Sequence, residues 1–150
     1  MTRAAGRCFL GGPALLGLVM AAAVPSGGDD APWTAPPEEH AKVNPLVPSN
    51  DALKRGRALF LKHCSTCHGQ QGRGDGPAAA FGMVSPRDLT SPAVQGRLSD
   101  GEMFWKISKG RRMGSEVLMP PGEEKVGKVE DRWRLVLFVR SLAPTQSQGR

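Results

Sequence analysis

Apolar residues recur at helical spacing in three segments of the chain, and stretches rich in proline and glycine separate these segments. The first segment begins after Ser49 or Asn50, either of which can cap a helix, and it runs to about Lys62. Its apolar face consists of Leu53, Gly56 and Phe60, with Leu59 beside them. This pattern predicts an amphipathic helix that packs one face on a core.

A second helix is predicted from Ser99 to Ser108, where Ser99 and Glu102 can form a capping box and Gly110 ends the pattern. Its apolar stripe consists of Met103, Phe104 and Ile107. A third helix is predicted from about Val129 to Leu142. Its apolar set is wide enough for deep burial and consists of Trp133, Leu135, Val136, Leu137, Phe138, Val139 and Leu142.

The remaining segments are predicted to be loops, including Gly69–Gly76 and residues 111–128. Few segments alternate with the two-residue period of a strand, so we expect an all-α domain of roughly three to five short helices and long loops. The chain has 19 Gly, 13 Pro and no Tyr among its 150 residues, so its apolar core is small. A core of this size usually needs a disulfide, a metal or a cofactor to stabilise it.

The N-terminal residues 1–23 have the features of an export signal. Two arginines precede a charge-free apolar run from Cys8 to Val24, and alanines at 21–23 are suited to signal peptidase. We expect cleavage near Val24, which also removes Cys8, while an uncleaved membrane anchor is the alternative. Export predicts a location in the periplasm or on the outer face of the cytoplasmic membrane.

Residues 24–48 contain six prolines and show neither a helical nor a strand period. We expect them to form an extended linker or arm, which either serves as a tether or lies along a partner or along the domain itself. The apolar residues suited to such contacts are Trp33, Leu46 and Val47. The folded domain is expected at residues 49–143, and a disordered tail at residues 144–150.

The motif that carries chemistry is Cys64-Ser65-Thr66-Cys67-His68, which has the form C-x-x-C-H. Cysteines three residues apart lie on one side of a helical turn, where two thiols can add to the two vinyl groups of one haem. The histidine that follows directly can then bind the iron. The motif therefore predicts one covalently bound haem c, with Cys64 and Cys67 as the attachment points and His68 as the proximal ligand.

Three other uses of these residues are less consistent with the sequence. A zinc site needs four ligands, and no second C-x-x-C or H-x-x-x-H pair completes one. A thioredoxin-like dithiol follows a strand in a βαβ unit, whereas a predicted helix precedes this motif. A disulfide between Cys64 and Cys67 would leave His68 without a role.

A methionine is the candidate for the sixth iron ligand. Met119 precedes Pro120-Pro121, and proline keeps the neighbouring backbone extended, which suits a rigid ligand loop. Met113 is the second candidate, because it lies in the same predicted loop. Met83 also follows the motif in a loop, whereas Met103 belongs to a helical stripe and is expected in the core.

These features together resemble class I c-type cytochromes over about residues 49–143: the C-x-x-C-H motif, Met119-Pro120-Pro121 well after it, and an aromatic-rich closing helix. Gly56 and Phe60 match the first helix of that family, and Trp133 and Phe138 match its closing helix. The resemblance implies the class I cytochrome c fold, in which short helices and long loops surround one covalently bound haem.

Within this class, the chain is most similar to the monohaem cytochrome subunit of the alternative quinol:cytochrome c reductase complex. The segments that carry this similarity are Asn44–Pro48, Gly74–Pro77, Leu98–Glu102 and Asp131–Trp133. The resemblance also implies that the region of Pro86 offers a backbone carbonyl to the outer ring nitrogen of His68. The segment Gly122–Glu130 is longer and more charged than the resemblance implies.

We therefore expect an electron carrier rather than an enzyme, which passes single electrons in a respiratory chain as a subunit or close partner of a membrane oxidoreductase complex. The alternatives are a haem enzyme or gas sensor with an open sixth iron position, and a redox or interaction domain without haem. The expected partners are redox proteins, with a membrane quinol-oxidising complex or a terminal oxidase as candidates. Association with the membrane would come through such a partner or through an uncleaved N-terminal segment.

The basic residues do not predict nucleic-acid binding, because they are scattered and no aromatic residues interleave with them, although the formal net charge is +6. By the resemblance, the haem edge is exposed near the ligand loop. We expect a basic rim there that attracts an acidic redox partner, formed by Lys106, Lys109, Arg111 and Arg112.

Overall fold

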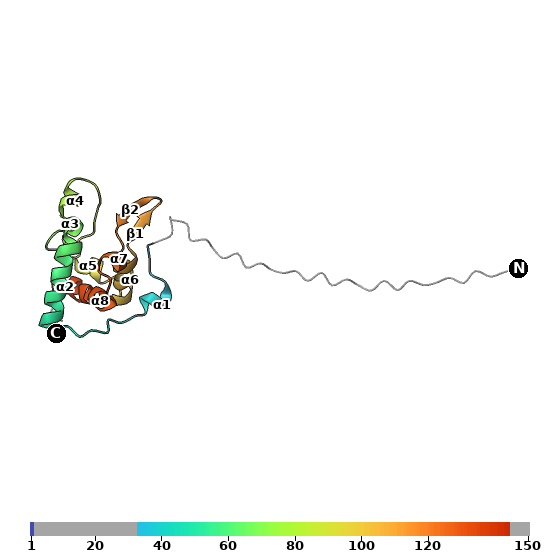
Figure 1. Ribbon diagram of the computed structural model, residues 1–150, viewed down its shortest axis with the longest axis horizontal. Helices are drawn as coiled ribbons and strands as arrows, with labels where there is room; N and C mark the ends of the chain where they lie inside the picture. Colours follow the sequence, from blue (N-terminus) through green and yellow to red (C-terminus); the bar gives the residue numbers. More distant parts are fainter. Residues whose placement is uncertain (2–32, 145–150) are drawn as a thin grey trace.

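The computed structural model describes Met1 and residues 33–144, and the domain that these residues form is shown in Figure 1. The helices and strands, in chain order, are α1 (Pro37–His40), α2 (Asn50–His63), α3 (Ser65–His68), α4 (Pro77–Ala80), α5 (Pro92–Gln95), α6 (Asp100–Lys109), β1 (Arg111–Met113), β2 (Glu116–Met119), α7 (Gly122–Lys125) and α8 (Val129–Leu142). Short helices and long loops dominate, so the predicted fold class is confirmed.

The centre of the core lies where α2 crosses α8. The hydroxyl of Ser49 caps α2 by accepting the N–H of Ala52 at 3.2 Å. Gly56 lies so close to α8 that a side chain there would collide with the carbonyl of Arg134 and the Cβ of Phe138. The most deeply buried core side chains lie on these two helices, with relative exposures of 1%, 1% and 0% for Phe60, Leu135 and Val136. The predicted bounds of α8 agree with the structure.

Helix α6 packs against α8 and completes the core. Ser99 caps it by accepting the N–H of Glu102 at 3.1 Å, as predicted. The carboxylate of Glu102 forms an ion pair with Lys106 at 2.9 Å. The ring of Phe104 stacks on Trp133 of α8, with 4.1 Å between centroids and 17° between planes.

Residues 111–128 were expected to be loop, and the structure corrects this expectation. Strands β1 and β2 form an antiparallel hairpin in which Arg111 lies opposite Met119. Gly114 has a φ of 57°, which allows the tight turn between the strands. Every residue of β1 is exposed, so no apolar alternation marks this strand in the sequence. The unexpectedly long segment after Pro121 contains the one-turn helix α7.

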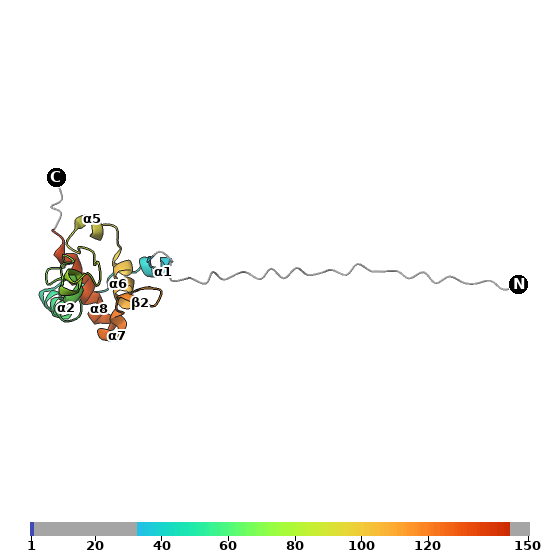
Figure 2. The same ribbon diagram turned by 90° about the horizontal axis from the view of Figure 1, so that it is seen from above.

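The described part of the arm, residues 33–48, lies along its own domain. Its one-turn helix α1 packs against α6, and Figures 1 and 2 both show these helices side by side. The hydroxyl of Ser99 donates to the carbonyl of His40 at 2.7 Å, and the amide of Asn44 donates to the carbonyl of Trp133 at 3.1 Å. Leu46 packs against the core cluster, whereas Val47 is 82% exposed.

The predicted export signal, apart from Met1, lies outside the described residues, as do the first residues of the arm and the tail after Pro144. Within residues 33–144, none of the helices has the length and apolar character that a membrane span requires.

Candidate functional site

The C-x-x-C-H motif forms a single helical turn that continues from the end of α2. The N–H of Cys64 donates to the carbonyl of Phe60 at 2.8 Å, which still belongs to the hydrogen-bond pattern of α2. The N–H of His68 donates to the carbonyl of Cys64 at 2.9 Å and closes the turn. The structure therefore brings Cys64, Cys67 and His68 together on one turn that is anchored to the core.

The glycine-rich loop after the motif folds back onto this turn. The N–H groups of Gly74 and Gly76 donate to the carbonyls of His68 and Cys67 at 2.9 and 3.1 Å. Gly74 has a φ of 82°, and a side chain there would meet the carbonyl of Pro86 at 2.6 Å. The loop is thus held between the motif and the Pro86 segment, and this arrangement fixes the backbone of His68.

Both cysteines of the motif are free thiols and half-buried. Cys64 packs against the core cluster. Burial, with a smaller contribution from neighbouring Cys67, raises the pKa of the Cys64 thiol to about 12. Cys64 is therefore a protonated thiol at neutral pH, and the structure does not pair it with Cys67 in a disulfide.

The imidazole of His68 is neutral at neutral pH, because burial lowers its pKa below the ordinary value. Its Nδ1 is buried and has no partner of normal hydrogen-bond geometry. The backbone of Arg87 opposes the pKa shift by weak hydrogen bonding to the ring. The backbone partner that the resemblance implies for the outer ring nitrogen, in the region of Pro86, stays a prediction, and the backbone of the neighbouring Arg87 is the candidate.

The candidate sixth ligand lies on a different element. Met119 is half-buried at the end of β2, whereas Met113 and Met83 are 52% and 67% exposed. Met103 is buried in the core, as predicted. In Figure 1 the α3–α4 segment and the hairpin both project at the upper end of the domain, and we call residues 64–89 and 111–119 together the motif end. The assignment of Met119 as a ligand stays a prediction.

Large apolar side chains are exposed on both parts of the motif end. Phe81 and Met83 follow α4 with exposures of 81% and 67%, and Met113 and Val117 lie on the hairpin with 52% and 39%. Sequence reasoning did not single out Phe81, although an aromatic residue in a glycine- and proline-rich loop is a usable signal. These side chains are candidates for contact with a partner.

Two of the four cations in the predicted basic rim are neutralised by ion pairs within the chain. Lys106 pairs with Glu102, and Lys109 pairs with Glu123 of α7 at 3.0 Å. Arg111 lies over the ring of Trp33. Arg111 and Arg112 are both exposed, and neither forms an ion pair with any residue the structure describes.

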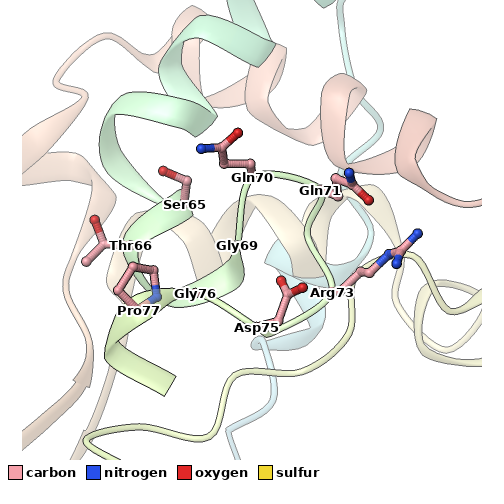
Figure 3. A pocket seen from close by; sticks show the side chains of 9 residues that line it. All are labelled: Ser65, Thr66, Gly69, Gln70, Gln71, Arg73, Asp75, Gly76 and Pro77. Carbon is pink, nitrogen blue, oxygen red and sulfur yellow. The ribbon is translucent and has the colours of Figure 1, made fainter. Parts of the chain in front are cut away.

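A hollow of about 500 Å³ lies on the outer side of the motif, as Figure 3 shows. Its lining consists of Ser65, Thr66, Gly69, Gln70, Gln71, Arg73, Asp75, Gly76 and Pro77. Ser65 and Thr66 are the two residues between the cysteines, and neither thiol nor the imidazole lines the hollow. The hollow is therefore polar surface behind the motif and is separate from the thiols and imidazole that would hold a haem.

The motif residues fit a covalently attached haem. Two unpaired thiols stand on one turn with a neutral imidazole, and the buried Nδ1 of that imidazole leaves Nε2 as the iron-binding atom. Among the described residues, no group of three or more His, Cys, Asp and Glu side chains is placed to hold a metal ion.

Comparisons with known proteins agree with this chemistry. The family described as cytochrome C oxidase, cbb3-type, subunit III matches residues 51–139. A component of the Kuenenia stuttgartiensis reducing HAO-like protein complex Kustc0457/Kustc0458 is 29% identical with a TM-score of 0.52, over 67% of this chain and 47% of that chain. This chain thus spans about half of that component.

A second solved structure, the KustC0563 c-type cytochrome, is 29% identical with a TM-score of 0.48. The match covers 59% of this chain and 98% of that cytochrome. A search of curated proteins found no match. The family match bears out the resemblance to the cytochrome c family, whereas the similarity to one particular reductase subunit is not confirmed.

Proposed function

The chain belongs to the cytochrome c family of the cbb3-type oxidase subunit III, and on this basis we propose that it carries single electrons on one haem c. The observation that carries the proposal is the pair of free thiols on one turn with a neutral imidazole. In this proposal Cys64 and Cys67 attach the haem, and His68 and Met119 are its axial ligands, with Met113 as the second candidate. Bound haem supplies a one-electron couple at its iron.

The residues of the chain hold and shield this couple. Burial keeps His68 neutral, so the lone pair of Nε2 is available. A backbone carbonyl near Arg87 that accepted the Nδ1 proton in the haem-loaded protein would fix the tautomer and raise the basicity of the ring. A thioether ligand such as Met119 favours the reduced state and raises the reduction potential. The closed core at Phe60 keeps water away from the inner side of the motif.

Electron transfer by such a site needs no bond-making side chain, so we propose a carrier rather than an enzyme. The test is the optical spectrum of the haem-loaded protein in both oxidation states. A six-coordinate low-spin spectrum supports the proposal. A five-coordinate high-spin spectrum favours the enzyme or gas sensor with an open sixth position, and a protein without haem absorption overturns both readings.

The proposed partners are redox proteins, and the proposed setting is a membrane oxidoreductase complex of a respiratory chain that oxidises quinol or ends in a terminal oxidase. Two observations support a bound partner: the exposed side chains of Phe81 and Met83, and the 29% identity to a protein whose name places it in a complex. The arm was expected to offer Trp33 and Leu46 to a partner. Both residues instead contact the chain's own domain.

A membrane preparation tests the proposed partner. We expect the haem to co-migrate with a large complex after gentle solubilisation of native membranes, and Phe81→Ser to weaken this association. Val43→Ser is the matched control, because Val43 is equally exposed, at 80%, but belongs to the arm. Full recovery of the haem as a soluble monomer without detergent would contradict the proposal.

We also propose that the protein is exported and works in the periplasm or at the outer face of the cytoplasmic membrane. The support is the apolar run behind two arginines at the N-terminus, together with the C-x-x-C-H motif, whose haem is attached outside the cytoplasm. Cell fractionation with a cytoplasmic marker tests this location. Holoprotein that stays with the cytoplasmic marker would contradict it.

A further inference from the structure

The arm forms a specific contact at the base of the hairpin. The indole Nε1–H of Trp33 donates to the carbonyl of Gly110 at 2.8 Å, across 77 residues of sequence. The ammonium of Lys106 lies 4.6 Å from the centroid of the same ring, and the guanidinium of Arg111 lies 5.4 Å from it. Trp33 therefore contacts the end of α6, the residue after it and the start of β1 at once.

Gly110, whose carbonyl accepts this hydrogen bond, packs directly against the backbone of Met119. Gly110 has a φ of 68°, and a side chain there would collide with the carbonyl of Met119 and lie 2.8 Å from the nitrogen of Pro121. Arg111, which follows Gly110, lies opposite Met119 in the hairpin register. The carbonyl that accepts from Trp33 thus belongs to the residue against which the Met119 backbone packs.

The hairpin needs such a contact, because its own packing is weak. All residues of β1 are exposed, and the first two residues of β2 are exposed as well. A two-stranded hairpin without a covered face is at best marginally stable in water. Its position therefore depends on what holds its base.

Trp33 is itself held in place by its contact with Lys106 and by the anchoring of the α1 segment that follows it in the chain. Lys106 is fixed by its ion pair with Glu102 at 2.9 Å, and its side chain is only 15% exposed. On the other side, α1 is packed so closely on α6 that a side chain on Gly101 would collide with the carbonyl of Glu39. The indole thus joins two fixed elements to a hairpin that is not fixed by burial.

We propose that Trp33 is a positioning residue that holds the base of the hairpin and thereby keeps Met119 at the iron. The role toward iron rests on the proposed function, because it assumes that Met119 is the sixth ligand. The contact with the hairpin does not rest on that assumption. The two parts are tested separately, on full-length holoprotein.

The first test measures how easily the hairpin opens. Hydrogen exchange of backbone amides 111–119 is compared in the wild type, Trp33→Phe, Trp33→Ala and the exposed-arm control Val43→Ala. Loss of the hydrogen bond alone in Trp33→Phe speeds exchange about threefold, and loss of the cation contacts as well in Trp33→Ala speeds it about tenfold. Exchange that is equal in Trp33→Ala and the wild type, or equally fast in Val43→Ala, overturns the proposal.

The second test measures access to the iron with imidazole as the probe, because imidazole can bind only where the methionine has left. Imidazole binding is monitored through the loss of the sulfur–iron absorption of the ferric protein. The dissociation constant of imidazole falls by the same factors, about threefold in Trp33→Phe and about tenfold in Trp33→Ala. It stays unchanged in Val43→Ala. A constant that does not move in either Trp33 variant overturns the role toward iron.

The two tests separate failure of the inference from failure of the proposed function. If the wild type shows no sulfur–iron absorption, the assignment of Met119 fails, and with it the role of Trp33 toward iron. Faster hydrogen exchange in the Trp33 variants would then still establish the contact with the hairpin. If the absorption is present and exchange is unchanged, the contact fails while the ligand assignment stands.

Discussion

The crossing of α2 and α8 differs from the motif end in how far its side chains are packed and paired within the chain. At the crossing, Gly56 lets the helices touch, and the buried carboxylate of Asp131 accepts from Arg55 and Arg134. At the motif end, two thiols are unpaired, the buried Nδ1 of His68 lacks a normal partner, and Phe81 is exposed. At the crossing the helices are in close contact and the carboxylate of Asp131 is paired, whereas at the motif end the thiols and the imidazole lack partners among the described residues.

This difference indicates that the crossing has a structural role and that the motif end has a binding role. Packing at the crossing supplies the rigid base from which α2 leads directly into the C-x-x-C-H turn. The motif end supplies the sulfur and nitrogen atoms that would hold the proposed haem, and its exposed Phe81 and Met83 would remain for a protein partner. The following changes test whether the two regions depend on different interactions.

The largest effect is expected from Cys64→Ala combined with Cys67→Ala. We expect no haem on the denatured chain and a largely unfolded protein, because a bound haem then no longer stabilises the folded state. Haem absorption after denaturing electrophoresis and far-UV circular dichroism measure the two effects. Cys8→Ala is the control and should leave both unchanged, whereas a stable folded double variant would refute the dependence on haem.

The next effect concerns one ligand and leaves the covalent attachment intact. Met119→Ala should abolish the sulfur–iron absorption of the oxidised protein, while Met113→Ala should leave it, because Met113 is exposed and Met119 is half-buried. Haem should stay bound in both variants through Cys64 and Cys67. The reverse pattern would show that Met113 is the ligand.

The helix crossing is tested by Gly56→Ala, which places a methyl group against the backbone of α8. We expect a loss of about 3 kcal/mol in the free energy of unfolding, because backbone cannot move aside as a flexible side chain can. Arg57→Ala, at the exposed neighbouring position, should change it by about 0.5 kcal/mol or less. Urea unfolding measures both, and equal stability of the two variants would disprove the close crossing.

The smallest effect is the pH dependence of the ion pair at the crossing. Hydrogen bonding from Arg55, with that from Arg134, lowers the pKa of Asp131 from 3.8 to about 2. Because the pKa of Asp131 is lower in the folded state, its ionised form stabilises the fold at pH values above 3.8. This stabilisation is lost as the pH falls toward about 2.

Asp131→Asn should therefore be about 1 kcal/mol less stable than the wild type near neutral pH. This difference should vanish by about pH 2 in urea unfolding measured across the acid range. Asp51→Asn is the comparison variant, because Asp51 is an exposed carboxylate that forms no ion pair with any described residue. A difference that stays constant with pH would mean that Asp131 acts through shape rather than charge.

Sequence reasoning succeeded where the signal is local or periodic. The apolar period gave α2, α6 and α8, because each of these helices buries one or more faces on the core. The C-x-x-C-H motif is contiguous, so its residues share a turn in the structure as the spacing predicts. Residues 111–119 carry no alternation because the hairpin is mostly exposed, and its strands were missed.

Contacts between distant residues could not be predicted in the same way. The bond from Trp33 to Gly110 joins positions 77 residues apart, and nothing local in the sequence marks it. The basic rim was expected to be free for the same reason, since the pairing of Lys109 with Glu123 depends on how α7 folds back onto α6.

The most direct test of the central claim is the intact mass of the purified, matured protein under denaturing conditions. The account predicts the mass of the chain plus one haem, because a single pair of cysteines, Cys64 and Cys67, stands at the motif end. The bare mass of the chain, or a haem that separates on denaturation, would contradict the claim that the motif end is completed by one covalently bound haem.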